Sequence, residues 1–175
     1  TLKRIVVAFI TTAGIGLILY KVIKKYFLSS EPLILGSLFL GGLVLILFDR
    51  WYRERPDSLV DLNRVSYMKC VFVGVAQSLA VIPGVSRAAA TIVGGLASGF
   101  SRKSIVEFSF LLAVPSILAA TVLDLVKNRA AFAGTDWSML WLGGAVSFGV
   151  AILSIRFFIR HVQNHGFTAF GVYRI

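Results

Sequence analysis

A short segment in the middle of the chain combines a turn, a hydroxyl group and an arginine with otherwise apolar residues. Its sequence is Leu79-Ala-Val-Ile-Pro-Gly-Val-Ser-Arg-Ala-Ala-Ala-Thr91. An arginine at the centre of a bilayer costs about 3 kcal/mol on insertion scales, so an arginine within a membrane segment indicates a functional site. Because an anion is the natural partner of a guanidinium group, Arg87 predicts an anion-binding site.

The residues around Arg87 favour phosphate as that anion. Ser86, which follows Pro83-Gly84, is well placed to cap a helix, so the free N–H groups and the positive end of the helix dipole lie beside Arg87. Such helix ends bind phosphate oxygens, and arginine adds bidentate hydrogen bonds. Thr91, on the same helix face, adds a hydroxyl group. In the alternative interpretation Pro83-Gly84 is a kink and Arg87 extends to a lipid headgroup; the spacing alone leaves both open.

Other polar residues are further candidates for this site. Gln77, in the segment before the turn, either lines the cavity or bonds across helices. Glu107 opens an apolar segment two residues before Ser109 and either orients the arginine or helps to hold a cation. The alternative, a carboxylate that complements the dipole at a helix start, is favoured by the spacing. His161 and His165 share a helical face without a third ligand nearby, so we expect surface residues and no metal site there.

Composition places the chain in a membrane. Of its 175 residues 57% are hydrophobic and 15% charged, which indicates a polytopic membrane protein and not a soluble domain. The net charge of +10 would suit nucleic acid, but most basic residues flank apolar runs, as at the helix ends of membrane proteins. We therefore expect no nucleic-acid partner. The single Cys70 excludes an internal disulfide and a cysteine metal cluster.

The apolar runs predict the fold class, an all-α polytopic membrane protein. The four runs predicted to span the membrane are Ile5 to Tyr20, Pro32 to Phe48, Glu107 to Leu125 and Leu140 to Phe158, and the polar connections are Asp49 to Arg64 and Lys127 to Asp136. Between Val71 and Phe100, Pro83-Gly84 separates two apolar halves, each too short at ~1.5 Å per residue to cross a ~30 Å core. We predict that these halves form a re-entrant helix-loop-helix hairpin, with Ser86 and Arg87 at its tip.

The distribution of basic residues predicts the orientation. A hairpin that enters and leaves on one side collects most of the basic residues on that side. They are Lys3, Arg4, Arg50, Arg53, Arg55, Arg64, Lys69, Arg102, Lys103, Arg156 and Arg160, whereas Lys21, Lys24, Lys25, Lys127 and Arg129 fall on the other. Loops rich in lysine and arginine stay in the cytoplasm, so the mouth of the hairpin is predicted to be cytoplasmic and its tip to point outward.

Several short motifs follow one another along the chain. They are Gly74-x-x-Gln77, Ile82-Pro-Gly-Val-Ser-Arg87 followed by Ala90-Thr-Ile92, Gly94-Gly95, Gly99-x-Ser-Arg102 and Glu107-Phe-Ser-Phe-Leu-Leu-Ala-x-Pro115. In order and spacing they resemble the bacterial undecaprenyl pyrophosphate phosphatases (BacA/UppP). The resemblance extends to Tyr173-Arg174 and so covers nearly all of the chain.

The resemblance implies an integral-membrane hydrolase of the bacterial cell (inner) membrane. Such an enzyme converts the C55 carrier undecaprenyl pyrophosphate to undecaprenyl phosphate, recycles it for peptidoglycan synthesis at the outer face, and confers bacitracin resistance. On the family pattern Ser86, Arg87 and Thr91 bind the pyrophosphate, and Arg87 stabilises charge on the transferred phosphoryl group. The wider set of candidate substrate contacts also contains Gly84, Gln77, Glu107 and Ser109.

The resemblance also implies groups that these residues do not supply. A divalent cation, Mg²⁺ or Ca²⁺, is implied, but the family's glutamate-rich motif and its Ser-Ser-Thr-Gly-His segment have no counterpart here. We therefore expect residues 1–175 to be a single integral-membrane domain that lacks an N-terminal portion and the last helix, and to be inactive alone. Ala88-Ala89 also replace the family's usual Ser-Gly, which removes a hydroxyl group and adds a methyl group beside the expected phosphate.

Two other classes of function remain open at this stage. A lipid or anion transporter built on the same broken helix is the alternative, because it too needs an anion at a half-helix N-terminus. A non-catalytic membrane scaffold is the third. Expected partners are the polyprenyl pyrophosphate and membrane lipids; a homodimer is compatible with the resemblance, and the sequence does not determine the oligomeric state.

Overall fold

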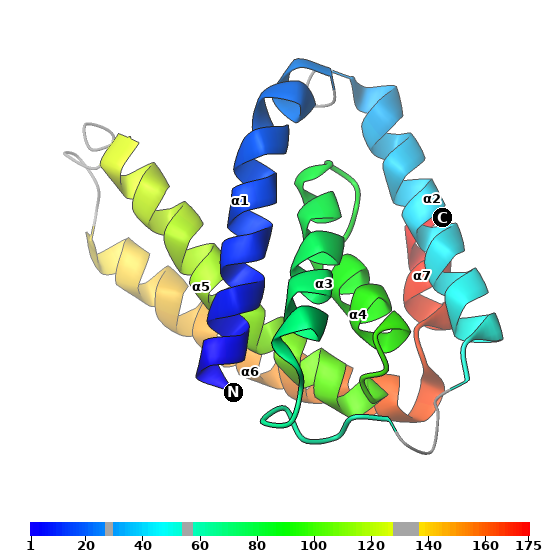
Figure 1. Cartoon of the computed structure of the whole chain (residues 1–175). Coiled ribbons are helices and arrows are strands. Elements are labelled where there is room, and N and C mark those ends of the chain that lie inside the picture. Colours follow the sequence, from blue (N-terminus) through cyan, green and yellow to red (C-terminus); the bar gives the residue numbers. More distant parts are fainter. Residues whose placement is uncertain (27–29, 54–57, 128–136) are drawn as a thin grey trace.

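Four long apolar helices dominate the part of the chain that the structure describes (Figure 1). The computed structural model describes residues 1–26, 30–53, 58–127 and 137–175, without the side chains of 20–22, 24–26, 163 and 164. The helices long and apolar enough to cross a membrane are α1 (Leu2–Tyr26), α2 (Glu31–Trp51), α5 (Arg102–Lys127) and α6 (Trp137–His165). Each contains one predicted span, so the all-α polytopic membrane fold is confirmed. The predicted polar connection Lys127 to Asp136 lies outside the described residues except for Lys127, as do 54–57 of the other connection.

Two shorter helices form a hairpin between α1 and α2. The first arm is α3 (Tyr67–Ser78) with a single 3-10 turn, η1 (Leu79–Val81), and the second arm is α4 (Arg87–Ala97). Both arms are apolar and shorter than a membrane span. Figure 1 shows the turn between them pointing toward the end of α1 and the start of α2. The predicted helix-loop-helix is therefore present, whereas its re-entry into a membrane stays a prediction.

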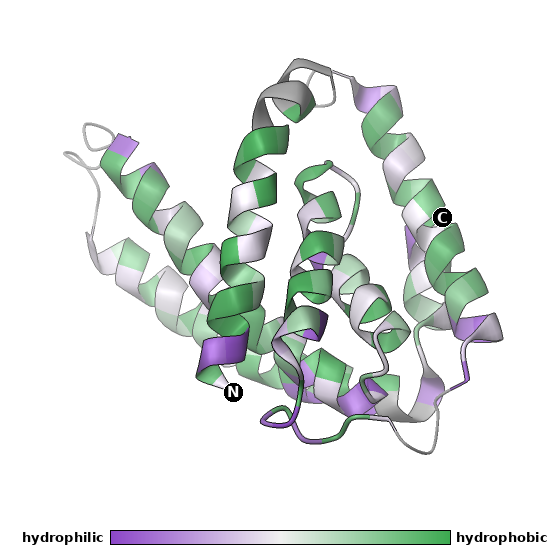
Figure 2. Ribbon diagram, viewed as in Figure 1, coloured by the Kyte–Doolittle hydropathy of each residue, from purple (hydrophilic) through white to green (hydrophobic). Residues whose placement is uncertain are grey.

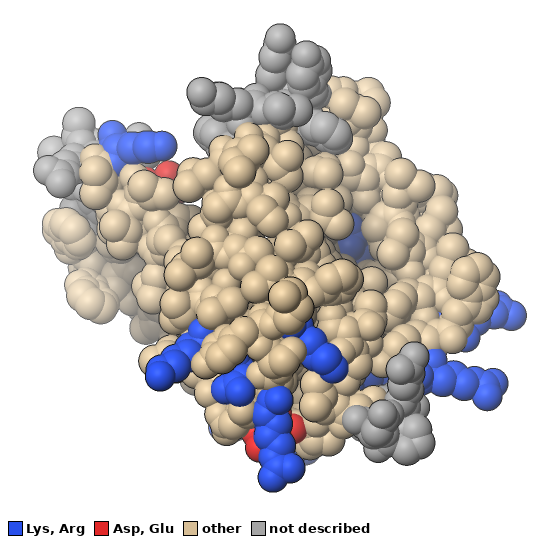
Figure 3. Space-filling model, in the orientation of Figure 1, with Lys and Arg blue, Asp and Glu red and all other residues tan. Residues whose placement is uncertain are grey.

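The helix ends that lie away from the hairpin turn are joined by hydrogen bonds at one polar end of the bundle. The amino group of Thr1 donates to Asn63 Oδ1 at 2.6 Å, and the backbone N–H of Leu59 donates to Gly99 O at 2.9 Å. Hydrophilic residues lie at this end (Figure 2), and blue side chains surround it (Figure 3). We call it the basic end; it comprises residues 1–4, 49–53, 58–69, 98–103 and 160–167. The hairpin thus starts and finishes at the same end, as predicted.

Close helix contacts hold the hairpin in the bundle. At Gly74 of α3 a Cβ atom would lie 2.6 Å from the backbone oxygen of Ala8 in α1. At Gly94 of α4 it would lie 2.4 Å from the Cβ atom of Ala76 in α3. Both distances are too short for any side chain, so glycine lets the helices approach through small residues, as is common between membrane helices. The two arms therefore have one packed arrangement relative to each other and to α1.

Substitution of Gly94 tests this packing. Gly94→Ala should force α3 and α4 apart and destabilise the protein by about 1–3 kcal/mol, the usual cost of overpacking. Gly144→Ala is the matched control, because nothing lies within 4 Å of a Cβ atom at that position of α6 and alanine is the better helix former. Thermal unfolding in one detergent should show a lower Tm for Gly94→Ala only. Equal Tm values for the two variants would contradict the close contact between the arms.

Candidate functional site

The turn of the hairpin depends on Gly84. Its φ angle is +90°, in the left-handed region that glycine adopts without strain. A Cβ atom here would also lie 2.5 Å from the backbone oxygen of Ile34 in α2. Gly84 therefore allows both the reversal of the chain and the close contact between the turn and α2. It lies in the turn, as predicted, and these two features give it a structural role there.

Ser86 caps α4 as the sequence predicts. Its hydroxyl oxygen accepts a hydrogen bond from the backbone N–H of Ala89 at 3.3 Å. Arg87 is the first residue of α4 and is exposed. Among the described residues no ion pair or side-chain hydrogen bond engages its guanidinium group, which is available to a ligand. The structure thus brings the cap, the positive helix end and a free cation together at the turn.

Thr91 and Gln77 face each other inside the hairpin. The Thr91 hydroxyl group is buried; it lies 2.8 Å from the backbone oxygen of Arg87 and 3.0 Å from Gln77 Oε1. Gln77 is 2% exposed, and its Nε2 atom has no hydrogen-bond partner within the described part of the chain. The pair joins the two arms. The predicted phosphate contact of Thr91 would require its hydroxyl group to exchange one of these bonds, and that role stays a prediction.

Glu107 and Ser109 lie on α5, far from the turn in the sequence and, within the described part of the chain, not bonded to it. Because α5 begins at Arg102, half-buried Glu107 lies in its second turn, and the interpretation as a helix-start carboxylate was wrong. Ser101 caps this helix instead and accepts from the backbone N–H of Ser104 at 3.2 Å. Ser109 is buried, and the described residues show no bond from it or from Glu107 to the turn. Their contact with substrate stays a prediction.

Arg174 is the residue that sequence reasoning missed. It ends the short helix α7 (Thr168–Arg174), and its Nη2 atom donates to the backbone oxygen of Gly84 in the turn. Its Nη1 atom is buried and has no hydrogen-bond partner among the described residues. The signal in the sequence was Tyr173-Arg174 among the family-like motifs. The structure therefore places a second guanidinium group at the hairpin turn.

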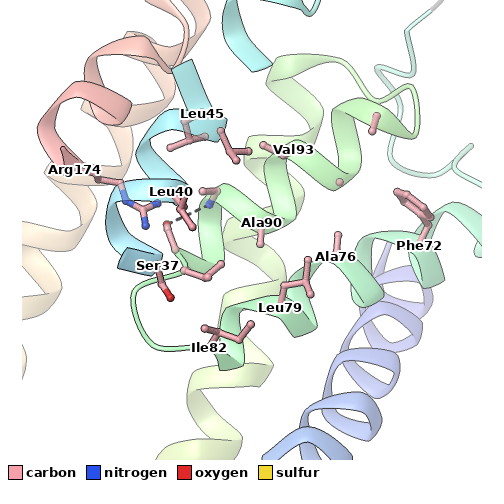
Figure 4. A pocket seen from close by; sticks show the side chains of 17 residues that line it. Ser37, Leu40, Leu45, Phe72, Ala76, Leu79, Ile82, Ala90, Val93 and Arg174 are labelled. Carbon is pink, nitrogen blue, oxygen red and sulfur yellow. Dashed lines mark hydrogen bonds between the residues drawn. The ribbon is translucent and has the colours of Figure 1, made fainter. Parts of the chain in front are cut away.

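An apolar groove leads to this turn. It lies between α2 and the hairpin and has a volume of about 490 Å³. Figure 4 shows Arg174 near one end and Phe72 near the other, with Leu40 and Leu45 of α2 facing the hairpin. A second cavity of about 380 Å³ is lined by residues of the turn and aromatic side chains of α6 and α7. Ser86 and Arg174 line both cavities, so the polar turn joins two apolar spaces.

The arrangement suits an amphiphile with an anionic head. A helix N-terminus and two guanidinium groups bind phosphate oxygens through charge-assisted hydrogen bonds. The apolar groove can take a hydrocarbon chain, because small-molecule sites combine apolar walls with a few placed polar groups. His161 and His165 stack with ring centroids 4.8 Å apart at the basic end, and the described residues contain no group of three or more metal-ligating side chains.

Fold and site together define an all-helical membrane protein whose apolar groove ends at a turn with donors for an anion. The model of the family described as bacitracin resistance protein BacA matches residues 1–175, and the chain belongs to this family. The undecaprenyl-diphosphatase of Sulfurihydrogenibium sp. (strain YO3AOP1) is 43% identical over 99% of this chain and 68% of its own length. Those of Aquifex aeolicus and Methanococcus aeolicus are 43% and 36% identical, each over 99% of this chain and 67% of its own length.

The bond between Thr91 and Gln77 can be tested by removing one partner and then both. Thr91→Val keeps the shape but leaves the Gln77 amide buried without its partner, which should cost about 1–3 kcal/mol of stability. Thr91→Ser keeps the hydroxyl group and should lose less. The double variant Thr91→Val/Gln77→Leu should recover part of the loss, because no buried polar group is then left unpaired. Unfolding midpoints measured in one detergent decide this; a Thr91→Val protein as stable as wild type would show that the bond does not hold the arms.

Proposed function

We propose that this chain acts as an undecaprenyl-diphosphatase, which hydrolyses undecaprenyl diphosphate to undecaprenyl phosphate and inorganic phosphate. The observation that carries the proposal is the turn at which an apolar groove meets the Ser86 cap and the Arg174 guanidinium group, with Arg87 exposed at the start of α4. The family match and the undecaprenyl-diphosphatases at 36–43% identity support it. A lipid diphosphate is a ligand that uses both an apolar groove and a phosphate cradle.

The diphosphate lies at the N-terminus of α4 in this proposal. Arg87, exposed and without a partner among the described residues, neutralises the charge that develops on the transferred phosphoryl group. Arg174 is already held on Gly84 O and offers its Nη1 atom as a second donor. Ala88, exposed beside Arg87, contributes no side-chain donor. Binding there therefore relies on the two arginines, Ser86 and backbone N–H groups.

The prenyl chain of the substrate lies in the groove between α2 and the hairpin. Small residues such as Gly41, Ala76 and Ala90 widen this groove, and its volume of about 490 Å³ holds the part of the chain next to the diphosphate. The rest of the chain extends into lipid. This placement brings the scissile phosphate to the turn without withdrawing the whole hydrocarbon chain from the membrane, which lowers the cost of binding.

The family resemblance also implies a divalent cation, and the described residues contain no cluster that would hold it by protein ligands alone. They bring together no three His, Cys, Asp or Glu side chains, so no step above passes through a metal ion. We propose that Mg²⁺ or Ca²⁺ is bound by groups outside the described residues. The acid-base groups of the reaction are proposed to lie there as well.

The cellular setting follows from orientation and activity. We place the protein in the bacterial inner membrane, with the basic end in the cytoplasm and the turn open to the outer side. Undecaprenyl phosphate released there returns to peptidoglycan synthesis, and a high turnover would confer bacitracin resistance. A homodimer is compatible with this proposal, and a transport function is the alternative that phosphate release and substrate flux distinguish from hydrolysis.

Replacement of Arg87 tests the hydrolase directly. In the intact protein Arg87→Ala should lower phosphate release from undecaprenyl diphosphate at least about 100-fold, because a transition-state cation is lost. Arg87→Lys should recover little, since an ammonium group lacks the bidentate fork. Arg64→Ala is the matched control, because that side chain is 85% exposed at the basic end and should leave release unchanged. Near-normal release by Arg87→Ala would contradict the site; substrate flux across vesicles without phosphate release would favour the transporter.

Cysteine labelling tests the orientation. In a Cys70→Ala background, Glu31→Cys marks the exposed start of α2 and Arg64→Cys marks the basic end. A membrane-impermeant maleimide should label the Glu31→Cys protein in intact cells and the Arg64→Cys protein only after permeabilisation. Native Cys70 is fully buried, so its replacement removes a competing thiol without exposing a new surface. The reverse labelling pattern would place the turn in the cytoplasm.

A further inference from the structure

A half-buried carboxylate at the basic end holds the start of α7. Oδ2 of Asp49, near the end of α2, accepts hydrogen bonds from the backbone N–H groups of Phe167 and Thr168 at 3.0 and 3.1 Å. It also accepts from the Thr168 hydroxyl group at 2.7 Å. Its Oδ1 atom forms an ion pair with Arg102 at 2.7 Å, and the Asp49 side chain is only 9% exposed. One carboxylate thus joins α2, α5 and the first turn of α7.

The backbone next to α7 is shaped to admit this carboxylate. Gly166 has a φ angle of +71°, and a Cβ atom there would lie 2.5 Å from Asp49 Oδ2. Phe167, the residue before α7, makes no cap with its own side chain. Asp49 therefore supplies from α2 the cap that α7 lacks in its own sequence, and a carboxylate at a helix N-terminus also meets the favourable end of the helix dipole.

From that anchor α7 leads directly to the hairpin turn. Helix α7 packs on α2 through glycines: a Cβ atom at Gly171 would lie 2.9 Å from Gly42 O, and one at Gly42 would lie 2.8 Å from Gly171 O. The Arg174 side chain then crosses Gly41, where a Cβ atom would lie 2.7 Å from Nη2, and donates to Gly84 O. Over its seven residues α7 spans ~10 Å, so the position of its first turn determines where the guanidinium group lies.

We propose that Asp49 is a positioning residue for Arg174. By capping α7 it holds the Arg174 guanidinium group on the hairpin turn, beside the Ser86 cap. The consequence for catalysis rests on the proposed function, whereas the consequence for the turn does not. Asp49 touches no substrate, and it acts only through α7. Removal of Asp49 therefore has the effect of displacing Arg174, and it has little further effect once Arg174 is gone.

A double-mutant cycle tests the catalytic arm in the intact protein. Asp49→Ala should lower kcat/KM for undecaprenyl diphosphate by about tenfold or more, because a small displacement of a positioned group is costly. In an Arg174→Met background the same change should alter kcat/KM by about twofold or less. If Asp49 contributes only general stability, the two losses multiply, since independent sites add in free energy. Multiplicative losses would overturn the proposal.

Amide hydrogen exchange tests the structural arm without substrate. Asp49→Ala should accelerate exchange in residues 168–175 and also in residues 82–86 of the turn, while residues 67–76 of α3 exchange as in wild type. Arg174→Met should accelerate exchange in the turn only. Faster exchange in α7 with an unchanged turn would show that α7 does not control the turn and would overturn the proposal. Faster exchange throughout α3 would mean general unfolding, which also counts against it.

The two arms separate the proposal from the function on which it rests. Thr168→Val serves as the intermediate control, because it removes one of the three donors to Oδ2 of Asp49 and keeps the ion pair at Oδ1; its effects on the turn should fall between wild type and Asp49→Ala. If the wild-type protein releases no phosphate, the proposed function fails while the exchange arm still decides the role of Asp49. If phosphate is released but the exchange pattern is absent, the positioning role fails alone.

Discussion

The structure depends on satisfying the backbone of one turn in apolar surroundings. Lipid offers no hydrogen bonds, so irregular backbone at membrane depth persists only where protein groups or a wet cavity supply them. Here Ser86 accepts from an N–H group on one side of the turn, and Arg174 donates to Gly84 O on the other. Both residues also line the cavities beside the turn. The groups that satisfy the backbone of the turn are therefore also groups that line the two cavities.

The two ends of the bundle differ in how their charges are used. At the basic end Arg102 is paired with Asp49, whose carboxylate also binds α7, so charge there joins helices. At the turn Arg87 has no partner among the described residues, and one nitrogen of Arg174 has none either. A guanidinium group left without a partner in an apolar protein is costly unless a ligand pairs with it. The asymmetry fits the proposal that the basic end joins helices while the turn binds an anion.

Local patterns in the sequence predicted most of the elements and one cap. Run length placed the four long helices, and two apolar halves too short to span predicted the hairpin. These local patterns could not predict contacts between residues far apart in the sequence. Arg174 and Gly84 are 90 residues apart, and Asp49 and Thr168 are 119 residues apart. Helical spacing put Thr91 on the face of Arg87, but packing against α3 turned its hydroxyl group inward to Gln77. The start of α5 was missed because Arg102 and Lys103 are polar, although they belong to its first turn.

The bond between Arg174 and Gly84 O bears on resistance to inhibitors. A compound that fills the apolar groove and pairs its own anion with Nη1 of Arg174 would bind a side chain that the turn itself requires. Substitution of Arg174 to escape such a compound would also leave a backbone carbonyl group without its donor in apolar surroundings, which costs folding free energy. Arg174 would be needed for the fold, whereas resistance to the compound would require its substitution. The end of the groove at Arg174 is therefore a better inhibitor target than its aliphatic walls.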